Sequence, residues 1–469
     1  MKKFILGLTA ASMLLAVSCK DKNNEDPTPV DPTPTTTEDI TGDISADRTL
    51  DASKKYTLKG FVYITNGATL HIPAGTVIMG DKATKGTLIV TRGAKIDAVG
   101  TVDKPVIFTS AQAANARREG DWGGVIILGN APVNATGGEA KIEGGLVATA
   151  GGDEKKYIYY GGTTSADNSG TLKYVRIEFA GIAYSPDNEI NGLTMGGVGS
   201  GTTISYVQVY RSGDDAFEWF GGTVNCDHLV ATYSWDDDWD TDNGFSGKVQ
   251  YCVSQRIKTI ADQSGSNGFE SDNDANGSTN SPKTMAKFAN MTVIGPILTT
   301  GNSGINANFQ NAAQIRRNSS ISIYNSLLVG FPVGLYIDDT KGSKTIENVK
   351  ANSLNFQGNI IAGCTIPWKA EALSTADSTA YKTWRTATAT TVLTGAGDVY
   401  MADPNKFSAA VSATTGTPNY LLQSTSPAMT GGVDVSGQGL QNTTYRGAFD
   451  GANDWTKTWT TYAAETAAY

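Results

Sequence analysis

The feature that most constrains the fold is a short segment that recurs between Tyr174 and Asp274. Its four copies begin at Tyr174, Tyr206, His228 and Tyr251, which places them 32, 22 and 23 residues apart. Each copy is a run of about five alternating residues, and each is followed by an acidic turn that contains glycine or alanine. A period in the low twenties, carried by short β-rich segments broken at Gly, Asn and Asp, is typical of a solenoid.

Stacking these copies produces columns of equivalent side chains. Strand alternation places Val175 and Ile177, with their counterparts in later copies, on one face, and Tyr174 with its counterparts on the other. The first set predicts a shared interior and the second predicts an outer ladder of rings. One strand cannot bury its apolar face alone, but stacked strands bury a continuous core. The sequence therefore predicts an all-β fold, a parallel β-helix.

Composition limits the partners more than it limits the fold. The chain has 469 residues, but a solenoid grows along one axis, so this length does not require several domains. The formal net charge is −9. This charge argues against nucleic acid as a partner and favours cations or neutral ligands. We expect a monomer.

The first residues have the layout of a secretory signal. Lys2-Lys3 precedes an apolar run from Phe4 to Val17, which is too short to span a membrane. The ending Ala16-Val17-Ser18-Cys19 resembles a bacterial lipobox, which implies a signal peptide over residues 1–18 and lipidation of Cys19. The alternative is an ordinary secreted protein. A Pro- and Thr-rich tether is expected over residues 19–39, and the folded body over 40–469.

Several glycine-punctuated segments in the body carry a family resemblance. They include Gly60-Phe-Val-Tyr-Ile, Gly120-Asp-Trp-Gly-Gly and Asp214-Asp-Ala-Phe-Glu-Trp. They resemble pectate-lyase-like β-helix proteins, in the form common in Bacteroidetes surface lipoproteins. The resemblance implies a single-stranded right-handed parallel β-helix, a pectin-lyase-like solenoid, over most of the chain. The acidic stretch after Cys19 resembles the export signal of such lipoproteins, which implies a lipid-anchored protein exposed at the outer membrane.

Two segments near the C-terminus are expected to differ from the repeated strands. The Ala-rich stretch from Trp368 to Arg385 lacks strand alternation, so we expect a short lateral helix there. Trp455 and Trp459 are expected to belong to a C-terminal capping segment that covers the open end of the last coil.

The densest acidic run predicts a cation site. If the chain is extended from Asp236 to Asp242, every second residue is an aspartate on one face. Such close carboxylates repel one another unless a cation or protons intervene, and hard oxygen ligands suit Ca²⁺. The alternative is a solvated acidic edge. The candidate ligands are Asp214, Asp215, Asp236, Asp238, Asp240, Asp242 and Asp272.

Basic residues near these acids are candidates for catalysis. Arg211 and Arg256 occupy the same repeat position, and Lys258 follows two residues later. Polysaccharide lyases of this fold use Ca²⁺ to neutralise a uronate and an Arg or Lys to remove a proton, so the resemblance implies that role for these three. The alternative is a structural ladder of ion pairs. A hydrolase is less favoured, because the polygalacturonase motifs around Asp214 and His228 are incomplete.

Aromatic residues near the acidic turns are candidates for sugar stacking. They are Tyr210, Trp219, Trp235 and Trp239. Flat rings beside polar groups suit sugar faces, and a long groove suits a long chain ligand. The sequence therefore favours a surface lipoprotein that binds an extracellular polysaccharide with the help of Ca²⁺. The alternatives are a Ca²⁺-dependent lyase and a structural or adhesive protein without a sugar ligand.

Overall fold

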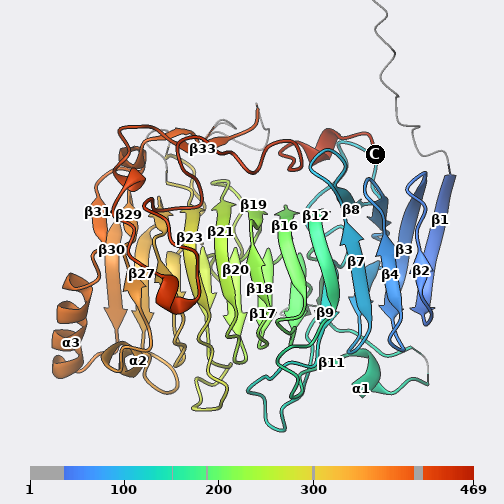
Figure 1. The fold of residues 1–469 in the computed structure, drawn as a ribbon, viewed down its shortest axis with the longest axis horizontal. Coiled ribbons are helices and arrows are strands. Elements are labelled where there is room, and N and C mark those ends of the chain that lie inside the picture. The colour runs from blue at the N-terminus through green and yellow to red at the C-terminus, as the bar shows by residue number, and fades with distance from the viewer. Residues whose placement is uncertain (1–35, 150, 186–187, 298–301, 406–415) are drawn as a thin grey trace, which may run out of the picture. The chain divides into compact units, whose positions relative to one another are not determined.

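A computed structural model of the chain describes residues 36–469 apart from 150, 186–187, 298–301 and 406–415. These residues form one stack of coils whose strands pair in parallel with those of the next coil (Figure 1). The predicted all-β parallel β-helix is therefore confirmed. Strand β1 begins at Thr36, so residues 36–39 belong to the fold and not to the tether. The predicted signal peptide and Cys19 lie outside the described residues.

Each coil contributes to three parallel sheets that run the length of the stack. Sheet 1 contains β2 (Arg48–Thr49), β4 (Thr69–Ile72), β7 (Lys95–Val99), β12 (Gly170–Glu178), β16 (Thr203–Tyr210), β18 (Asn225–Asp227), β21 (Lys248–Gln255), β23 (Lys287–Ile294), β25 (Ser322–Tyr324) and β28 (Phe356–Gln357). Sheet 2 continues from the second halves of β12, β16, β21 and β23, and adds β1 (Thr36–Ile44), β3 (Lys54–Ile64), β5 (Val77–Gly80), β8 (Val106–Ser110), β19 (Val230–Thr232), β26 (Leu327–Val329), β29 (Ile360–Ala362) and β31 (Thr391–Leu393).

Sheet 3 closes each coil, and its strands carry acidic residues such as Glu218, Asp240 and Glu270. It contains the ends of β1 and β3 together with β6 (Thr87–Val90), β9 (Val125–Leu128), β15 (Leu193–Gly196), β17 (Phe217–Phe220), β20 (Trp239–Asp242), β22 (Phe269–Ser271), β24 (Asn311–Ile315), β27 (Val333–Asp338) and β30 (Ile366–Glu371). Within the described residues, three antiparallel pairs lie outside the stack: β10 (Ala140–Lys141) with β11 (Tyr159–Tyr160), β13 (Ala183–Ser185) with β14 (Asn188–Glu189), and β32 (Met401–Asp403) with β33 (Asn419–Leu422).

The described residues contain three short α-helices: α1 (Glu154–Tyr157), α2 (Ile346–Lys350) and α3 (Thr375–Thr386). Helix α3 confirms the predicted lateral helix, although the stretch before it forms β30. The helix begins where the Ser374 hydroxyl accepts a hydrogen bond from the Asp377 amide at 3.1 Å, a usual N-cap arrangement. Among the described residues, none of the helices has both the length and the apolar character needed to cross a membrane.

A continuous apolar core fills the inside of the stack. The predicted inward residues Val175 and Ile177 are completely buried, as is Cys252 in a later coil. Cys226, Cys252 and Cys364 are buried free thiols. Full burial of one such aliphatic side chain contributes about 1.5–3 kcal/mol, and parallel pairing satisfies the backbone groups of each coil.

The predicted outer ladder marks the corner between sheets 1 and 2. Tyr174, Tyr206, His228 and Tyr251 adopt left-handed backbone conformations with φ from 52° to 59°, so the chain turns at each of them. Their rings stack with centroid distances of 4.6, 4.3 and 5.4 Å. This stacking offsets a backbone conformation that costs non-glycine residues about 1–2 kcal/mol.

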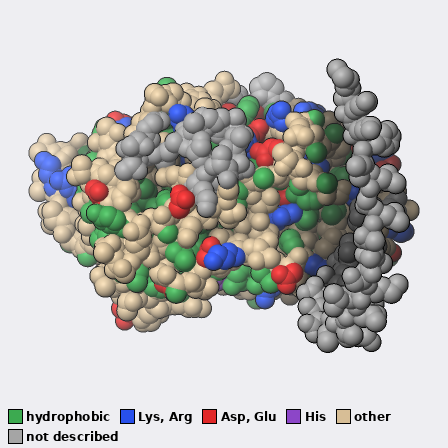
Figure 2. Space-filling view, turned by 90° about the horizontal axis from the view of Figure 1, so that it is seen from above, with side chains coloured by type: hydrophobic (Ala, Val, Ile, Leu, Met, Phe, Trp, Pro, Cys, Tyr) green, Lys and Arg blue, Asp and Glu red, His purple; other side chains and the backbone are tan. Residues whose placement is uncertain are grey.

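The C-terminal segment runs back along the stack instead of covering its end (Figure 1). Trp455 and Trp459 pack edge-on against Tyr206 of the ladder at 6.4 and 6.0 Å, so the predicted covering of the last coil is wrong. Further along, the Gln208 side chain donates to the Thr461 carbonyl at 2.8 Å, and the Tyr469 hydroxyl donates to Glu178 at 2.7 Å. Seen from above, Lys and Arg side chains are interspersed with Asp and Glu over the described residues (Figure 2).

Candidate cation and glycan site

One outward column of sheet 3 is acidic over three successive coils. Glu218 on β17, Asp240 on β20 and Glu270 on β22 occupy the same register position. In β20, Trp239 and Thr241 point into the core, whereas Asp240 and Asp242 are partly exposed. Strand alternation therefore aligns carboxylates one coil apart, a spacing of about 4.8 Å.

A second column precedes these strands and links the coils through side-chain oxygens. The Asp237 amide donates to Asp215 Oδ1 at 2.7 Å, and the Asn267 amide donates to Asp237 Oδ1. One coil further, the Asn311 amide donates to Asn267 Oδ1 at 3.1 Å. Each side chain satisfies a backbone donor of the next coil with one oxygen. The second oxygen of Asp215 and of Asp237 is left for other contacts.

These two columns and the loops beside them surround a hollow of about 220 Å³, here called the acidic basin. Asp214 and Asp236 join it from the turns, and Glu143 joins from the loop that follows β10. The acidic residues that line the basin are Glu143, Asp214, Asp215, Glu218, Asp236, Asp237, Asp240 and Glu270. Three groups have carboxylate oxygens within 4.8 Å of one another: Asp214/Asp215/Asp236, Asp215/Glu218/Asp240 and Asp237/Asp240/Glu270.

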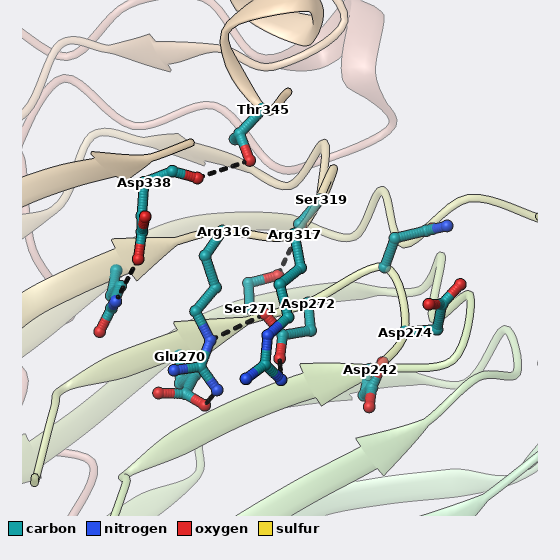
Figure 3. A network of polar contacts seen from close by, with 12 residues as sticks. Asp242, Glu270, Ser271, Asp272, Asp274, Arg316, Arg317, Ser319, Asp338 and Thr345 are labelled. Carbon is teal, nitrogen blue, oxygen red and sulfur yellow. Dashed lines mark hydrogen bonds and ion pairs between the residues drawn. The ribbon is translucent and has the colours of Figure 1, made fainter. Parts of the chain in front are cut away.

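Few positive charges balance this cluster. Of the described residues that line the basin, Arg316 alone is basic, and it pairs with Glu270 and with Asp272 at 2.9 Å. In Figure 3, Arg316 and Arg317 extend from one coil toward Glu270 and Asp272 on the coil before. Arg316 therefore neutralises one edge of the basin and leaves most of its carboxylates without a cationic partner.

The surroundings of the remaining carboxylates disfavour their charged form. Burial, followed by repulsion from neighbouring carboxylates, raises the pKa of Asp215, Glu218 and Asp240 well above the usual range. Burial raises the pKa of Glu270 to about 7, although Arg316 opposes the shift. The Oδ1 atoms of Asp236 and Asp240 are buried without a hydrogen-bond donor among the described residues. Protons or a multivalent cation would relieve this repulsion.

The oxygen set fits Ca²⁺. All candidate ligands are carboxylates, and Ca²⁺ takes six to eight oxygen ligands in adaptable geometry. Carboxylate oxygens such as Asp240 Oδ1, which accept no hydrogen bond from the described residues and lie close to carboxylates of other coils, are available as ligand atoms. Soft metals that prefer thiolate or imidazole would find neither among the described lining residues.

Comparison with known proteins identifies the family of this chain. The family model described as a pectate-lyase-like β-helix domain matches residues 42–404. The chain belongs to this family. The crystal structure of pectate lyase Pel9A aligns with a TM-score of 0.33 and 12% identity, over 89% of this chain and 86% of that one. No curated protein matches the sequence.

Four of the seven predicted metal ligands line the basin: Asp214, Asp215, Asp236 and Asp240. The other three do not line it. Asp238 is completely buried against Arg256, because the strand begins only at Trp239 and residues before it do not alternate. Asp242 and Asp272 lie further along, where Asp272 pairs with Arg317 at 2.6 Å (Figure 3).

The structure places the two arginines with predicted catalytic roles in buried ion pairs, and the role of Lys258 stays a prediction. Arg211 is buried at the corner after β16 and pairs with Glu119 and Glu465, and its guanidinium lies over the Tyr233 ring at 5.5 Å. Arg256 is buried in the core with Asp238. Lys258 donates to the Ser303 carbonyl at 2.8 Å and is not among the residues that line the basin. The alternative of structural ion pairs holds for both arginines.

Three of the four predicted sugar-stacking residues are buried. Tyr210, Trp219 and Trp239 have no exposed surface. Alternation turns Trp219 and Trp239 into the coil core, whereas Tyr210 points out of it and is covered by the C-terminal segment, where its hydroxyl donates to Glu465 at 2.9 Å. Trp219 stacks on Phe245 at 5.2 Å, and Trp239 stacks on Phe217 at the same distance. Trp235 differs, since it is 43% exposed and directly precedes Asp236 of the basin. Its contact with a sugar stays a prediction.

Four basin residues were absent from the predicted ligand set: Glu143, Glu218, Asp237 and Glu270. Glu218 and Glu270 have a clear signal in the sequence, because they occupy the repeat position of Asp240. Asp237 was missed because strict alternation was extended across a turn. The repeat gives no signal for Glu143, since this residue comes from a loop far earlier in the chain. The side-chain amide of Asn191 holds it in place by donating to Glu143 Oε1 at 3.2 Å.

Proposed function

We propose that this protein is a lipid-anchored surface protein that binds an acidic extracellular polysaccharide through Ca²⁺ held in the acidic basin. The observation that carries the proposal is the set of eight carboxylates around one open hollow, with a single ion-paired arginine at its edge. Membership of the pectate-lyase-like β-helix family supports a function that involves polysaccharide.

In this proposal, the ion and the sugar contact different residues in and near the basin. The group Asp215, Glu218 and Asp240 would hold Ca²⁺, since it combines carboxylates from successive coils. The bound ion supplies positive charge to which a uronate carboxylate attaches. The exposed ring of Trp235, the residue before Asp236, offers a flat apolar surface for a sugar ring. Arg316 remains paired with Glu270 and Asp272 and keeps that edge ordered.

Binding is favoured over the lyase alternative. A lyase needs a basic side chain that is free to accept a proton beside the bound sugar. Arg211 and Arg256 are held in buried ion pairs, and Arg316 is held in a partly exposed one. The neighbouring carboxylates hold the pKa of Arg316 above its usual value, despite burial, so it remains protonated.

Binding is tested with full-length protein in detergent and a panel of uronate polysaccharides, with Ca²⁺ or with chelator. We expect retention on at least one polysaccharide with Ca²⁺ only, and a loss on the order of tenfold in Trp235→Ala. Tyr400→Ala removes another exposed ring and is the matched control. Ca²⁺-dependent formation of unsaturated uronate would instead support the lyase. Retention that is indifferent to chelator would contradict the proposal.

The anchor is tested separately. We expect cells to incorporate labelled fatty acid into the wild-type protein but not into Cys19→Ser, and external protease to degrade the wild-type protein on intact cells. Label that persists in Cys19→Ser would contradict lipidation at this residue.

A further inference from the structure

A second hollow lies on sheet 1, away from the acidic strands of sheet 3. Its volume is about 470 Å³, within the range of about 300–1,000 Å³ common for ligand pockets. It lies over the late coils, between the loop that follows α2 and the turn at residues 433–438 of the C-terminal segment. This hollow is here called the polar groove. It shares no lining residue with the acidic basin.

The floor of the polar groove is a regular array of polar side chains. Lys287 on β23 pairs in register with Ser322 on β25, and Tyr324 pairs with Gln357 on β28. Ser322 and Tyr324 are about 95% buried, so they form a fixed floor. Lys287 and Gln357 are partly exposed and line the same hollow.

Both walls of the polar groove are tied to the coils. On one side, the Val433 amide donates to the Asn325 side chain at 2.8 Å, and the Val433 carbonyl accepts from the same side chain at 2.9 Å. On the other side, the Ser320 hydroxyl donates to Ser353 at 2.9 Å. The groove is therefore fixed by side chains of the solenoid and does not depend on a loop closing over it.

Several polar groups in the polar groove have no partner among the residues that the structure describes. The Lys287 ammonium and the side-chain amides of Gln357 and Gln438 make no hydrogen bond or ion pair with the described residues. Asp434, the one carboxylate among the described lining residues, accepts a hydrogen bond from the Ser436 amide at 2.8 Å within its own turn. The groove thus offers donors and acceptors but lacks the clustered carboxylates that a cation would require.

We propose that the polar groove is a second glycan site that binds a neutral saccharide without a metal ion. Amide and ammonium groups match the hydroxyls of a sugar, which both donate and accept hydrogen bonds. The half-exposed Met285 side chain at one edge gives an apolar contact for a ring face. This inference is independent of the acidic basin, because it needs neither Ca²⁺ nor a charged sugar.

The test uses full-length protein in detergent with chelator present throughout. Isothermal titration is carried out with neutral oligosaccharides built from glucose, mannose, galactose or xylose. We expect at least one of them to bind, and we expect Gln357→Ala and Lys287→Ala each to weaken binding on the order of tenfold. Gln112→Ala and Lys95→Ala remove the same groups elsewhere on the solenoid and are expected to bind as the wild type does.

Two further results separate this site from the basin. Asp240→Asn is expected to leave neutral-sugar binding unchanged, and Ca²⁺ is expected to have no effect on it. The proposal is overturned if none of the neutral oligosaccharides binds, or if binding survives both groove substitutions. Binding that appears only with Ca²⁺ and disappears in Asp240→Asn would assign the sugar to the basin and would also overturn it.

Discussion

Arg256 Nε lies 3.0 Å from Asp238 Oδ1, and neither side chain has any exposed surface. The same guanidinium donates to the Ser234 carbonyl at 2.8 Å and to the Asn267 carbonyl. This pair joins the corner after β21 to the start of β20 inside the core. Arg256 was predicted to be catalytic and Asp238 to bind a metal ion, but the buried pair gives both residues a structural role.

Arg256→Ala is expected to destabilise the fold without a specific loss of ligand binding. Removal of one partner leaves Asp238 buried without its cation, which costs about 3–5 kcal/mol. Denaturant unfolding measures the change. The control is Arg118→Ala. Among the described residues, this side chain donates only to carbonyls of its own turn, so we expect its loss to change stability by less than about 1 kcal/mol. Unchanged stability with lost activity on a polysaccharide would restore the catalytic role.

Substitution of a buried tryptophan is expected to lower the free energy of unfolding far more than substitution of an exposed one. Trp219→Ala and Trp239→Ala each remove a completely buried ring, and each is expected to lower the free energy of unfolding by about 3–5 kcal/mol. Trp235→Ala removes an exposed ring and is expected to change stability by about 0.5 kcal/mol or less. Equal losses for all three in thermal or denaturant unfolding would contradict this division.

The stability of the metal-free protein is expected to fall as pH rises. Burial raises the pKa of Glu270 to about 7 and that of Asp242 to about 8, whereas unfolded carboxyl groups titrate near about 4. Between these values the folded state binds more protons than the unfolded state. Linkage then requires stability to decrease as pH increases from about 4 to about 8.

Unfolding with chelator at about pH 5 and about pH 8 measures this slope. Ca²⁺ is expected to restore stability mainly at the higher pH, because there it does not compete with protons for the carboxylates. A chelated protein that is more stable at the higher pH would show that the basin carboxylates are not repelling one another.

The sequence was sufficient to predict the solenoid but only part of the site. The period of Tyr174, Tyr206, His228 and Tyr251 predicts stacked coils because equivalent positions must meet in a parallel stack. The same period aligns Glu218, Asp240 and Glu270. The path of the C-terminal segment has no comparable signal, since it depends on contacts such as that between Gln208 and Thr461, 253 residues apart.

Errors at single residues arose where the backbone leaves the strand. Alternation was extended through Asp236, Asp237 and Asp238, but β20 begins at Trp239, so Asp238 points into the core and Asp237 lines the basin. Arg211 has φ of 55°, which directs its side chain away from the strand pattern toward Glu119. Side-chain direction at a corner depends on this backbone conformation, and a repeat in the sequence does not reveal it.

The most direct test of the account is calorimetric titration of the chelator-treated protein with Ca²⁺. We compare the wild type with Asp240→Asn in the basin and with Asp103→Asn, an exposed residue in a turn between early strands that removes the same charge. The account predicts saturable binding by the wild type and Asp103→Asn, and binding weakened at least about tenfold in Asp240→Asn. Absence of binding, or equal affinity in all three proteins, would contradict a cation site in the basin.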